Sequence, residues 1–171
     1  MLDRTTSRPQ VAILTAVATT FLVGTVWAQD AVKESFGAWE LQCQTSAGSQ
    51  TKQCAIGQTV RSEDKGNVNL TIVIVKPPEI NATVLRVVAP LSVYLLNGVA
   101  LKIDQTDIGR VPFFRCTPGG CIADMPIDDK LLNQLTSAKI ATLVIYLDPS
   151  EGLRHQVKLE GLQQGLKKLR E

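Results

Sequence analysis

From Ala38 onward, apolar and polar residues alternate with a period near two, the pattern of β-strands that bury one face. In the first of these segments Trp39, Leu41 and Cys43 fall on the same face. Turn residues interrupt the pattern often, so the strands are expected to be short. They are predicted at 39–43, 54–60, 70–75, 83–88, 93–96, 99–103, 111–116, 121–125, 140–147 and 154–160.

Two segments are almost continuously apolar, 70–75 and 140–147. Such runs are typical of buried strands, and the β-branched 70–75 is expected at the centre of a sheet with both faces covered. The pair Asn97-Gly98 predicts a hairpin turn between 93–96 and 99–103, and 104–109 is expected to form another turn.

The period changes after residue 127. Asp128 is a suitable N-cap, and Ile127 and Leu132 are spaced to form a hydrophobic staple around it, so a helix is predicted over about 129–136. A second short helix is predicted over about 162–169. About ten short strands with two peripheral helices indicate a mainly β protein, an antiparallel β-sandwich or a partly open barrel.

The N-terminus has the pattern of a cleaved export signal. Arg4 and Arg8 precede an apolar run of about 16 residues, shorter than the roughly 20 needed to span a bilayer, and the run ends in small or modest residues before a predicted cut between Ala28 and Gln29. We therefore expect a signal peptide over 1–28 and a single soluble domain over 29–171. No second apolar span follows, so the mature chain is expected to be periplasmic or secreted.

The net charge argues against a nucleic-acid partner. The whole chain carries +2, and the signal contributes Asp3, Arg4 and Arg8, which leaves +1 for residues 29–171. This near-neutral balance lacks the basic character of a general nucleic-acid binder.

The four cysteines form two close pairs, Cys43 with Cys54 and Cys116 with Cys121. Neighbour pairing is favoured because strands joined by a tight turn place opposite residues within bridging distance. A zinc site is disfavoured, since its usual C-x-x-C spacing is missing and His155 is the only histidine. A redox dithiol would also need a C-x-x-C at the start of a helix. We predict two structural disulfides, Cys43–Cys54 and Cys116–Cys121, and no metal.

Several short segments stand out by their order and spacing: 36–39, Cys43, 54–58, 87–91, 97–104, 114–116 and 120–123. Together they resemble the invasion-associated locus B family, whose members are exported proteins of Gram-negative bacteria. The resemblance covers 36–166 and implies a periplasmic or envelope β-sandwich. The family is named after a member linked to entry of pathogens into host cells, and it supplies no catalytic residues to carry over.

Candidate catalytic groups are few. His155 would have to serve any Ser-His-Asp or Cys-His mechanism, but its position in a strand with Val157 and Leu159 favours a histidine at the edge of the core. Asp128 and Asp129 are explained by helix capping and the helix dipole. The acidic residues of the turns, Asp104, Asp107 and Asp148, lack the regular ligand spacing of a known calcium loop.

The sequence therefore predicts a non-enzymatic envelope protein without catalytic residues, cofactor or metal, which binds an unidentified envelope or host macromolecule through a sheet face or the loops at one end. Two alternatives remain open: a periplasmic hydrolase that uses His155, and a carrier of a small apolar ligand between the sheets. Leu162, Leu166 and Leu169 recur at helical spacing beside Lys167 and Lys168. This C-terminal helix either closes one end of the sandwich or makes a peripheral membrane contact.

Overall fold

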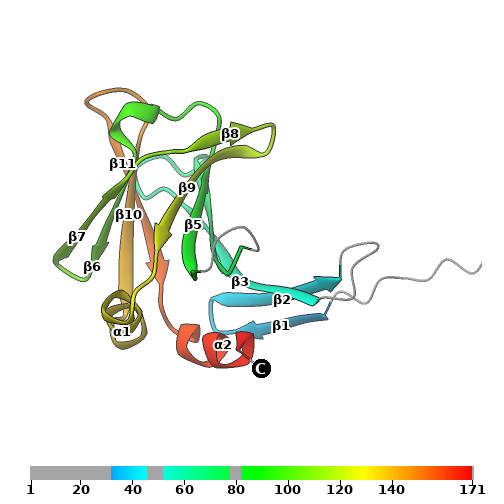
Figure 1. Ribbon diagram of the computed structural model, residues 1–171. Helices are drawn as coiled ribbons and strands as arrows, with labels where there is room; N and C mark the ends of the chain where they lie inside the picture. The colour runs from blue at the N-terminus through cyan, green and yellow to red at the C-terminus, as the bar shows by residue number, and fades with distance from the viewer. Residues whose placement is uncertain (1–31, 46–51, 78–81, 171) are drawn as a thin grey trace, which may run out of the picture.

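A computed structural model describes residues 32–45, 52–77 and 82–170 of the chain (Figure 1). The predicted cleavage site, Ala28 and Gln29, lies outside these residues. The elements are, in order, β1 (Val32–Phe36), β2 (Trp39–Thr45), β3 (Lys52–Arg61), β4 (Asn69–Val75), β5 (Val84–Ala89), the 3₁₀ helix η1 (Leu95–Asn97), β6 (Val99–Ile103), β7 (Thr106–Val111), β8 (Arg115–Thr117), β9 (Gly120–Pro126), α1 (Asp129–Ser137), β10 (Ile140–Tyr146), β11 (Gly152–Lys158) and α2 (Leu162–Leu169).

The strands form two antiparallel sheets, as predicted. The larger sheet has the order β1-β2-β3-β4-β5-β9-β8, and the smaller has the order β11-β10-β6-β7. The sheets meet where Ser62, just after β3, forms an isolated bridge with His155 of β11. The described strands form two separate antiparallel sheets and no closed barrel, which confirms the predicted mainly β fold.

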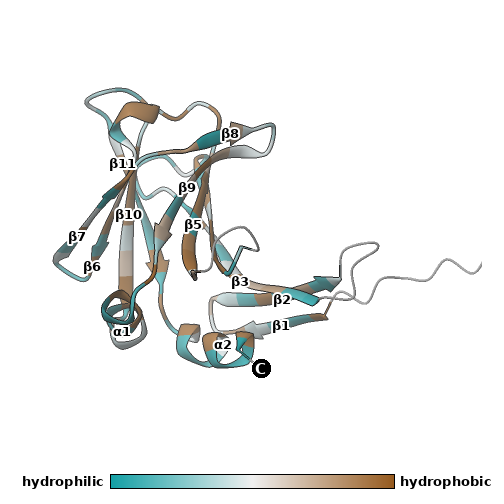
Figure 2. Cartoon of the chain, in the orientation of Figure 1, coloured by the Kyte–Doolittle hydropathy of each residue, from teal (hydrophilic) through white to brown (hydrophobic). Residues whose placement is uncertain are grey.

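The core lies between the two sheets and is built from alternate residues of each strand. Ile72 and Ile74 of the larger sheet and Leu143 and Ile145 of the smaller are almost completely buried. Trp39 is buried as well, and its indole Nε1 donates a hydrogen bond to the Lys158 carbonyl at 2.8 Å. Apolar and polar residues alternate along the strands in the same way when the chain is coloured by residue hydropathy (Figure 2).

The expectation that strand 70–75 is covered on both faces is wrong. In β4, Leu70, Ile72 and Ile74 are buried, Asn69 and Thr71 are exposed, and the remaining residues are intermediate. β10 shows the same alternation. In a two-layer sandwich each sheet covers only one face of the other, so β-branched residues on the outer face stay partly in solvent. An apolar run alone does not distinguish this arrangement from a doubly covered strand.

The predicted strand at 93–96 is also wrong, because Leu95–Asn97 is a 3₁₀ helix. The chain needs this compact turn to cross from one sheet to the other, and Gly98 ends it with φ +59°. A Cβ at Gly98 would collide with the Val111 carbonyl. The Asn97-Gly98 pair thus ends a sheet-to-sheet crossover, where a hairpin was predicted.

Two further boundaries differ from the prediction. Residues 106–111, most of which were expected to form a turn, belong to β7, so the turn contains only Asp104 and Gln105. Asp104 takes a left-handed backbone conformation there, with φ +51°. The predicted strand at 111–116 is divided between the end of β7 and β8. β1 was not predicted, because only its two end residues are apolar. It pairs with β2 along its whole length, so its backbone hydrogen bonds determine its conformation.

The helix predicted after Asp128 is confirmed. The Asp128 carboxylate accepts a hydrogen bond from the Leu131 amide at 2.7 Å, as an N-cap should, and α1 extends to Ser137. The terminal helix α2 has the predicted limits 162–169. Among the described residues, no helix has the length and apolar character needed to cross a bilayer.

Three glycines hold α2 against the larger sheet. Gly161 has φ +85°, and a side chain there would collide with the Phe36 carbonyl, while a Cβ on Gly37 would approach the Glu160 carbonyl to 2.7 Å. A Cβ on Gly165 would collide with the Ile56 side chain. Gly161 and Gly165 weaken the helix in isolation, and their close packing against the sheet explains their presence.

Candidate binding surfaces

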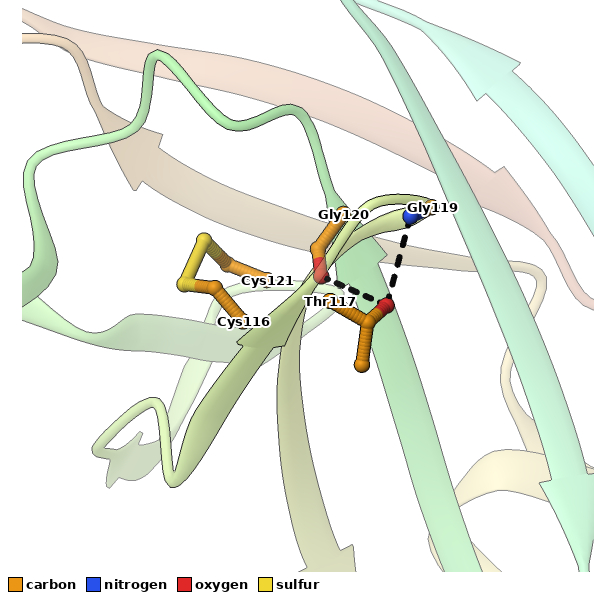
Figure 3. The surroundings of a disulfide bond; sticks show 5 residues. All are labelled: Cys116, Thr117, Gly119, Gly120 and Cys121. Carbon is orange, nitrogen blue, oxygen red and sulfur yellow. Dashed lines mark hydrogen bonds between the residues drawn. A yellow bond between two sulfur atoms is a disulfide. The ribbon is translucent and has the colours of Figure 1, made fainter.

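Both predicted disulfides are present, and all four cysteines of the chain are used. Cys43 lies opposite Cys54 in the β2–β3 ladder, and Cys116 lies opposite Cys121 in the β8–β9 ladder. In the second hairpin the Thr117 hydroxyl accepts from the Gly119 amide at 3.3 Å and donates to the Gly120 carbonyl at 3.4 Å (Figure 3). The two bridges lie in hairpins at opposite ends of the molecule.

Large apolar side chains are exposed at the end of the sandwich that carries η1 and the β8–β9 hairpin, which we call the loop end. Leu96 is 85% exposed, Leu91 60%, Phe114 53% and Leu95 46%. We call these four residues the apolar loop surface. A single exposed leucine is ordinary, but three exposed leucines within six residues, with an exposed phenylalanine at the same end, are the kind of feature that marks interaction sites.

The rest of the fold holds this surface in place. The Tyr94 amide donates to the Tyr146 carbonyl at 2.6 Å, and the Asn97 side chain donates to the Pro149 carbonyl at 3.2 Å. The Arg115 guanidinium lies 5.4 Å from the centre of the Phe114 ring. The leucines therefore project from a loop attached to the β10–β11 turn. Sequence reasoning missed them because an apolar segment was assigned to a strand that does not form.

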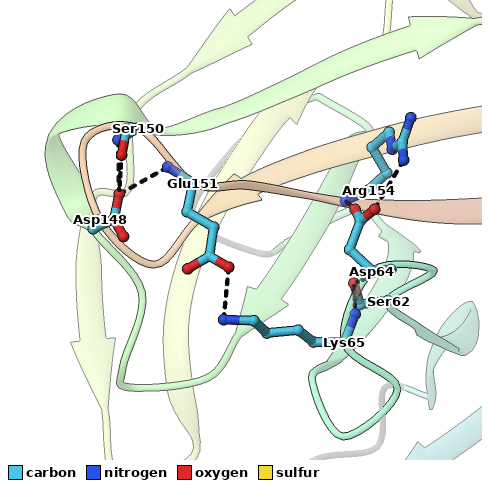
Figure 4. Close-up of polar contacts among 7 residues, drawn as sticks. All are labelled: Ser62, Asp64, Lys65, Asp148, Ser150, Glu151 and Arg154. Atoms are coloured by element: carbon cyan, nitrogen blue, oxygen red, sulfur yellow. Dashed lines mark hydrogen bonds and ion pairs between the residues drawn. The ribbon is translucent and has the colours of Figure 1, made fainter.

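Charged residues at the same end are paired with each other. Asp64 accepts from the Arg154 side chain at 2.8 Å and from its backbone amide at 2.9 Å, and these bonds hold the pKa of Asp64 below its usual range. Lys65 forms an ion pair with Glu151 at 2.6 Å (Figure 4). These contacts fix the β3–β4 and β10–β11 turns to one another.

Asp148 is a turn residue, as predicted. Its carboxylate accepts from the Ser150 amide and hydroxyl and from the Glu151 amide, each at 2.8 Å, which lowers the pKa of Asp148 (Figure 4). These bonds explain the residue without a ligand.

His155 is completely buried in β11, between Leu153 and Val157 on the inward face. Its Nε2 lies 3.2 Å from the Val68 carbonyl and its Nδ1 3.3 Å from the Leu153 carbonyl. Burial is the main influence on the ring and lowers the pKa of His155, so the neutral form is favoured. A neutral ring donates through one nitrogen only, and both nitrogens face backbone carbonyls rather than a serine hydroxyl or a carboxylate. His155 is therefore not exposed as the base that the predicted hydrolase would use.

The other candidate residues are not assembled into a site. Asp104 and Asp107 are exposed at the β6–β7 turn, and the Asp107 carboxylate accepts from the Gly109 amide at 3.0 Å. Asp128 is used in capping and Asp129 is in the first turn of α1. Within 32–45, 52–77 and 82–170, no group of three histidine, cysteine or acidic residues is arranged to hold a metal ion.

The space between the sheets is filled by side chains. A residual cavity of about 10 Å³ among Ile72, Leu101, Leu143 and their neighbours has room for about one water molecule. This cavity is far smaller than the roughly 300–1,000 Å³ of a typical small-molecule site. Of the three leucines of the C-terminal helix, Leu162 and Leu166 are buried against the larger sheet, and Leu169 is partly exposed.

These features define a two-sheet, disulfide-linked β-sandwich protein, with exposed surfaces as its candidate sites. A family model described as "Invasion associated locus B (IalB) protein" matches residues 39–170, most of the chain. The chain belongs to this family, as its resemblance indicated.

A solved structure supports the fold assignment. The crystal structure of invasion associated protein b from Bartonella henselae superposes with a TM-score of 0.65 at 21% sequence identity, and the match covers 82% of this chain and 95% of that one. At this identity the likeness establishes the shared fold. Comparison with curated protein sequences gives no match.

Proposed function

We propose that this protein is an exported, non-enzymatic envelope protein that binds another macromolecule through its apolar loop surface. The observation that carries the proposal is the exposure of Leu91, Leu95, Leu96 and Phe114 on loops anchored to a rigid, disulfide-linked sandwich. Loops held by a rigid scaffold are where binding residues concentrate, and exposed apolar clusters are favourable to cover.

Export is supported by two independent features. The first 28 residues have the pattern of a cleaved signal peptide. All four cysteines are paired in disulfides, which persist in oxidising compartments such as the bacterial periplasm. The proposed location is therefore the periplasm or the cell exterior of a Gram-negative bacterium.

A binding role is favoured over catalysis by the surroundings of His155. The only histidine of the chain is completely buried against backbone carbonyls. All four cysteines are in disulfides, so none is available as a nucleophile.

The proposed partner is a macromolecule of the bacterial envelope or of a host cell. The structurally similar protein from Bartonella henselae is described as invasion associated. The likeness to it supports the host-cell version of this proposal.

Site-specific photocrosslinking in the expressing bacterium tests the proposed function. A photoreactive residue at position 96 should give a discrete crosslinked species, whereas the same residue at exposed position 105, on the β6–β7 turn, should not. The species should disappear when Leu91 and Phe114 are both replaced by Asp, with circular dichroism showing an intact fold. Identical crosslinks from positions 96 and 105, or none from position 96, would contradict the proposal.

A further inference from the structure

The two disulfides join opposite residues of a hairpin in the same way, but their cysteines differ in exposure. In the first, Cys43 is 5% exposed and Cys54 is partly buried. In the second, Cys121 is 1% exposed, whereas Cys116 is exposed. Among the four cysteines of the chain, Cys116 is therefore the one that an external reagent reaches most easily.

The strands that carry the two bridges differ as well. β2 and β3 have 7 and 10 residues, and each pairs with a neighbouring strand on both sides. β8 has 3 residues and is the last strand of the larger sheet, where it pairs with β9. Of its residues, Arg115 and Cys116 are exposed and Thr117 is partly buried. A segment with so little buried surface opens locally at a small cost in free energy.

Apart from the bridge, a small number of contacts hold β8 in its hairpin. Its register with β9 has 3 residue pairs, and the hydrogen bonds of the Thr117 hydroxyl close the turn (Figure 3). The amide of Phe114, just before β8, donates to the Ile122 carbonyl at 3.0 Å. The bridge therefore stabilises β8 and, with it, the position of Phe114 in the apolar loop surface.

Thiol–disulfide exchange has a preferred direction at this bridge. A thiolate attacks one sulfur of a disulfide, and the other sulfur leaves. Because Cys116 is exposed and Cys121 lies in the core, attack from solvent falls on Cys116 and releases Cys121. The core can hold a free Cys121, since a buried thiol packs as a small apolar side chain. β9 also pairs with β5 through 6 residue pairs that do not depend on the bridge.

We propose that Cys116–Cys121 is a reversible redox site, reduced by a protein dithiol of the Cys-x-x-Cys class, and that its reduction releases β8 and Phe114. One thiolate of the dithiol bonds to Cys116 Sγ, the bond to Cys121 breaks, and Cys121 takes up the proton that the attacking thiol has lost. The second thiol of the dithiol then attacks the first, and Cys116 leaves and takes up the second proton. The dithiol is oxidised to a disulfide, and the same two electrons reduce the bridge to two thiols.

The effect of this reduction on binding rests on the proposed function, in which Phe114 contacts the partner. Exposed disulfides are in general the labile and regulatory ones, and shielded disulfides are the structural ones. Reduction would regulate the apolar loop surface by releasing one of its four residues while the sandwich keeps its Cys43–Cys54 bridge.

The order of reduction tests the redox site. Folded, oxidised protein purified from the periplasm of an expressing bacterium is treated with dithiothreitol or with reduced thioredoxin, a Cys-x-x-Cys protein. After acid quenching and alkylation in denaturant, mass spectrometry identifies the free cysteines. Cys116 and Cys121 should appear together, at least tenfold faster than Cys43 and Cys54, with either reagent.

Two outcomes of this experiment would contradict the inference. Equal rates for the two bridges, or faster reduction of Cys43–Cys54, would show that Cys116–Cys121 is not selectively accessible. Reduction by dithiothreitol but not by thioredoxin would restrict the site to small thiols and overturn the protein reductant.

Two variants that lack the same bridge test the direction of attack. Cys121→Ala leaves Cys116 as a free thiol, and Cys116→Ala leaves Cys121. Oxidised glutathione should form a mixed disulfide with Cys116 at least tenfold faster than with Cys121, because Cys116 is exposed and Cys121 is buried. Circular dichroism checks that both variants are folded. Similar rates, or a faster reaction at Cys121, would overturn the proposed direction.

Hydrogen exchange measures the release of β8 in the wild-type protein. When Cys116–Cys121 alone is reduced, the Phe114 amide should exchange at least tenfold faster, while the amides of β3 keep their rates. Unchanged exchange at Phe114 would overturn the release. This readout needs no partner, so it stays decisive even if photocrosslinking from position 96 contradicts the proposed function. A crosslink from position 96 that is insensitive to reduction would exclude the regulatory effect and leave the proposed function intact.

Discussion

The two ends of the sandwich use their leucine side chains in opposite ways. At the loop end, charged residues such as Asp64 and Arg154 are paired, while Leu96 is 85% exposed. At the end where α2 packs against β1, β2 and β3, which we call the helix end, Leu162 and Leu166 are buried. A leucine at the helix end therefore stabilises the fold, and a leucine at the loop end is available to a partner.

Truncating one leucine at each end should give the largest contrast. Leu166→Ala removes a buried side chain that is 5% exposed and is expected to lower the free energy of unfolding by about 2–5 kcal/mol. Leu96→Ala should change it by less than about 0.5 kcal/mol, because the side chain is already in solvent. Urea denaturation of both variants measures the difference. A loss of similar size at the two positions would show that Leu96 packs in the folded protein.

Removing each disulfide separately should lower the free energy of unfolding by different amounts at the two ends. The difference is expected to be smaller than the difference between the two leucine variants. Their sequence separations are 11 residues for Cys43–Cys54 and 5 for Cys116–Cys121. Chain-entropy estimates give about 3 kcal/mol for the first and about 2 kcal/mol for the second. Paired Cys→Ser variants, compared by urea denaturation, measure both values. A larger loss of stability on removing Cys116–Cys121 than on removing Cys43–Cys54 would contradict this prediction. It would show that the number of residues enclosed by a disulfide does not determine how much that disulfide stabilises the protein.

Gly161 tests the packing that places α2 at the helix end. Gly161→Ala adds a side chain at positive φ against the Phe36 carbonyl and is expected to cost about 2–3 kcal/mol. Gly66→Ala is the matched control in the β3–β4 turn of the loop end, where a Cβ would have no neighbour within 4 Å. Gly66→Ala should leave the free energy of unfolding unchanged or raise it by up to about 1 kcal/mol. Thermal unfolding of both variants checks the prediction, which fails if Gly161→Ala is tolerated as well as Gly66→Ala.

His155 should give the smallest effect, a change of stability with pH. Its pKa in the folded protein is lowered from 6.5 by burial, so the unfolded chain takes up the proton first as the pH falls. Stability is therefore complete above about pH 6.5 and declines as the pH drops below that value toward the lowered pKa. Because the chain has one histidine, His155→Gln should remove the pH dependence between about 5 and 7. Unfolding curves for the two proteins across this range measure it, and an unchanged slope in the variant would contradict the prediction.

Local sequence signals predicted the features that depend on neighbouring residues. The Asp128 N-cap, the extent of α2 and the two disulfide pairings all rest on groups close together in the chain, and all are present. β1 was missed because its middle residues are polar and the ladder with β2 determines its conformation. Residues 93–96 were assigned to a strand because they are mostly apolar. Nothing in their sequence indicates that the chain crosses from one sheet to the other at this point.

The sequence by itself determined that this chain is mainly β, where its strands alternate, and which cysteines join. Strand periodicity and disulfide pairing across a hairpin are short-range properties. Only the tertiary structure decided that the leucines of 91–96 face solvent and that Gly161 and Gly165 allow α2 to approach the sheet. It also brought Leu41, Leu132 and Arg170 together along one groove. Exposure and proximity depend on which distant segment packs against a residue, and the hydrophobic pattern of a single segment does not encode that choice.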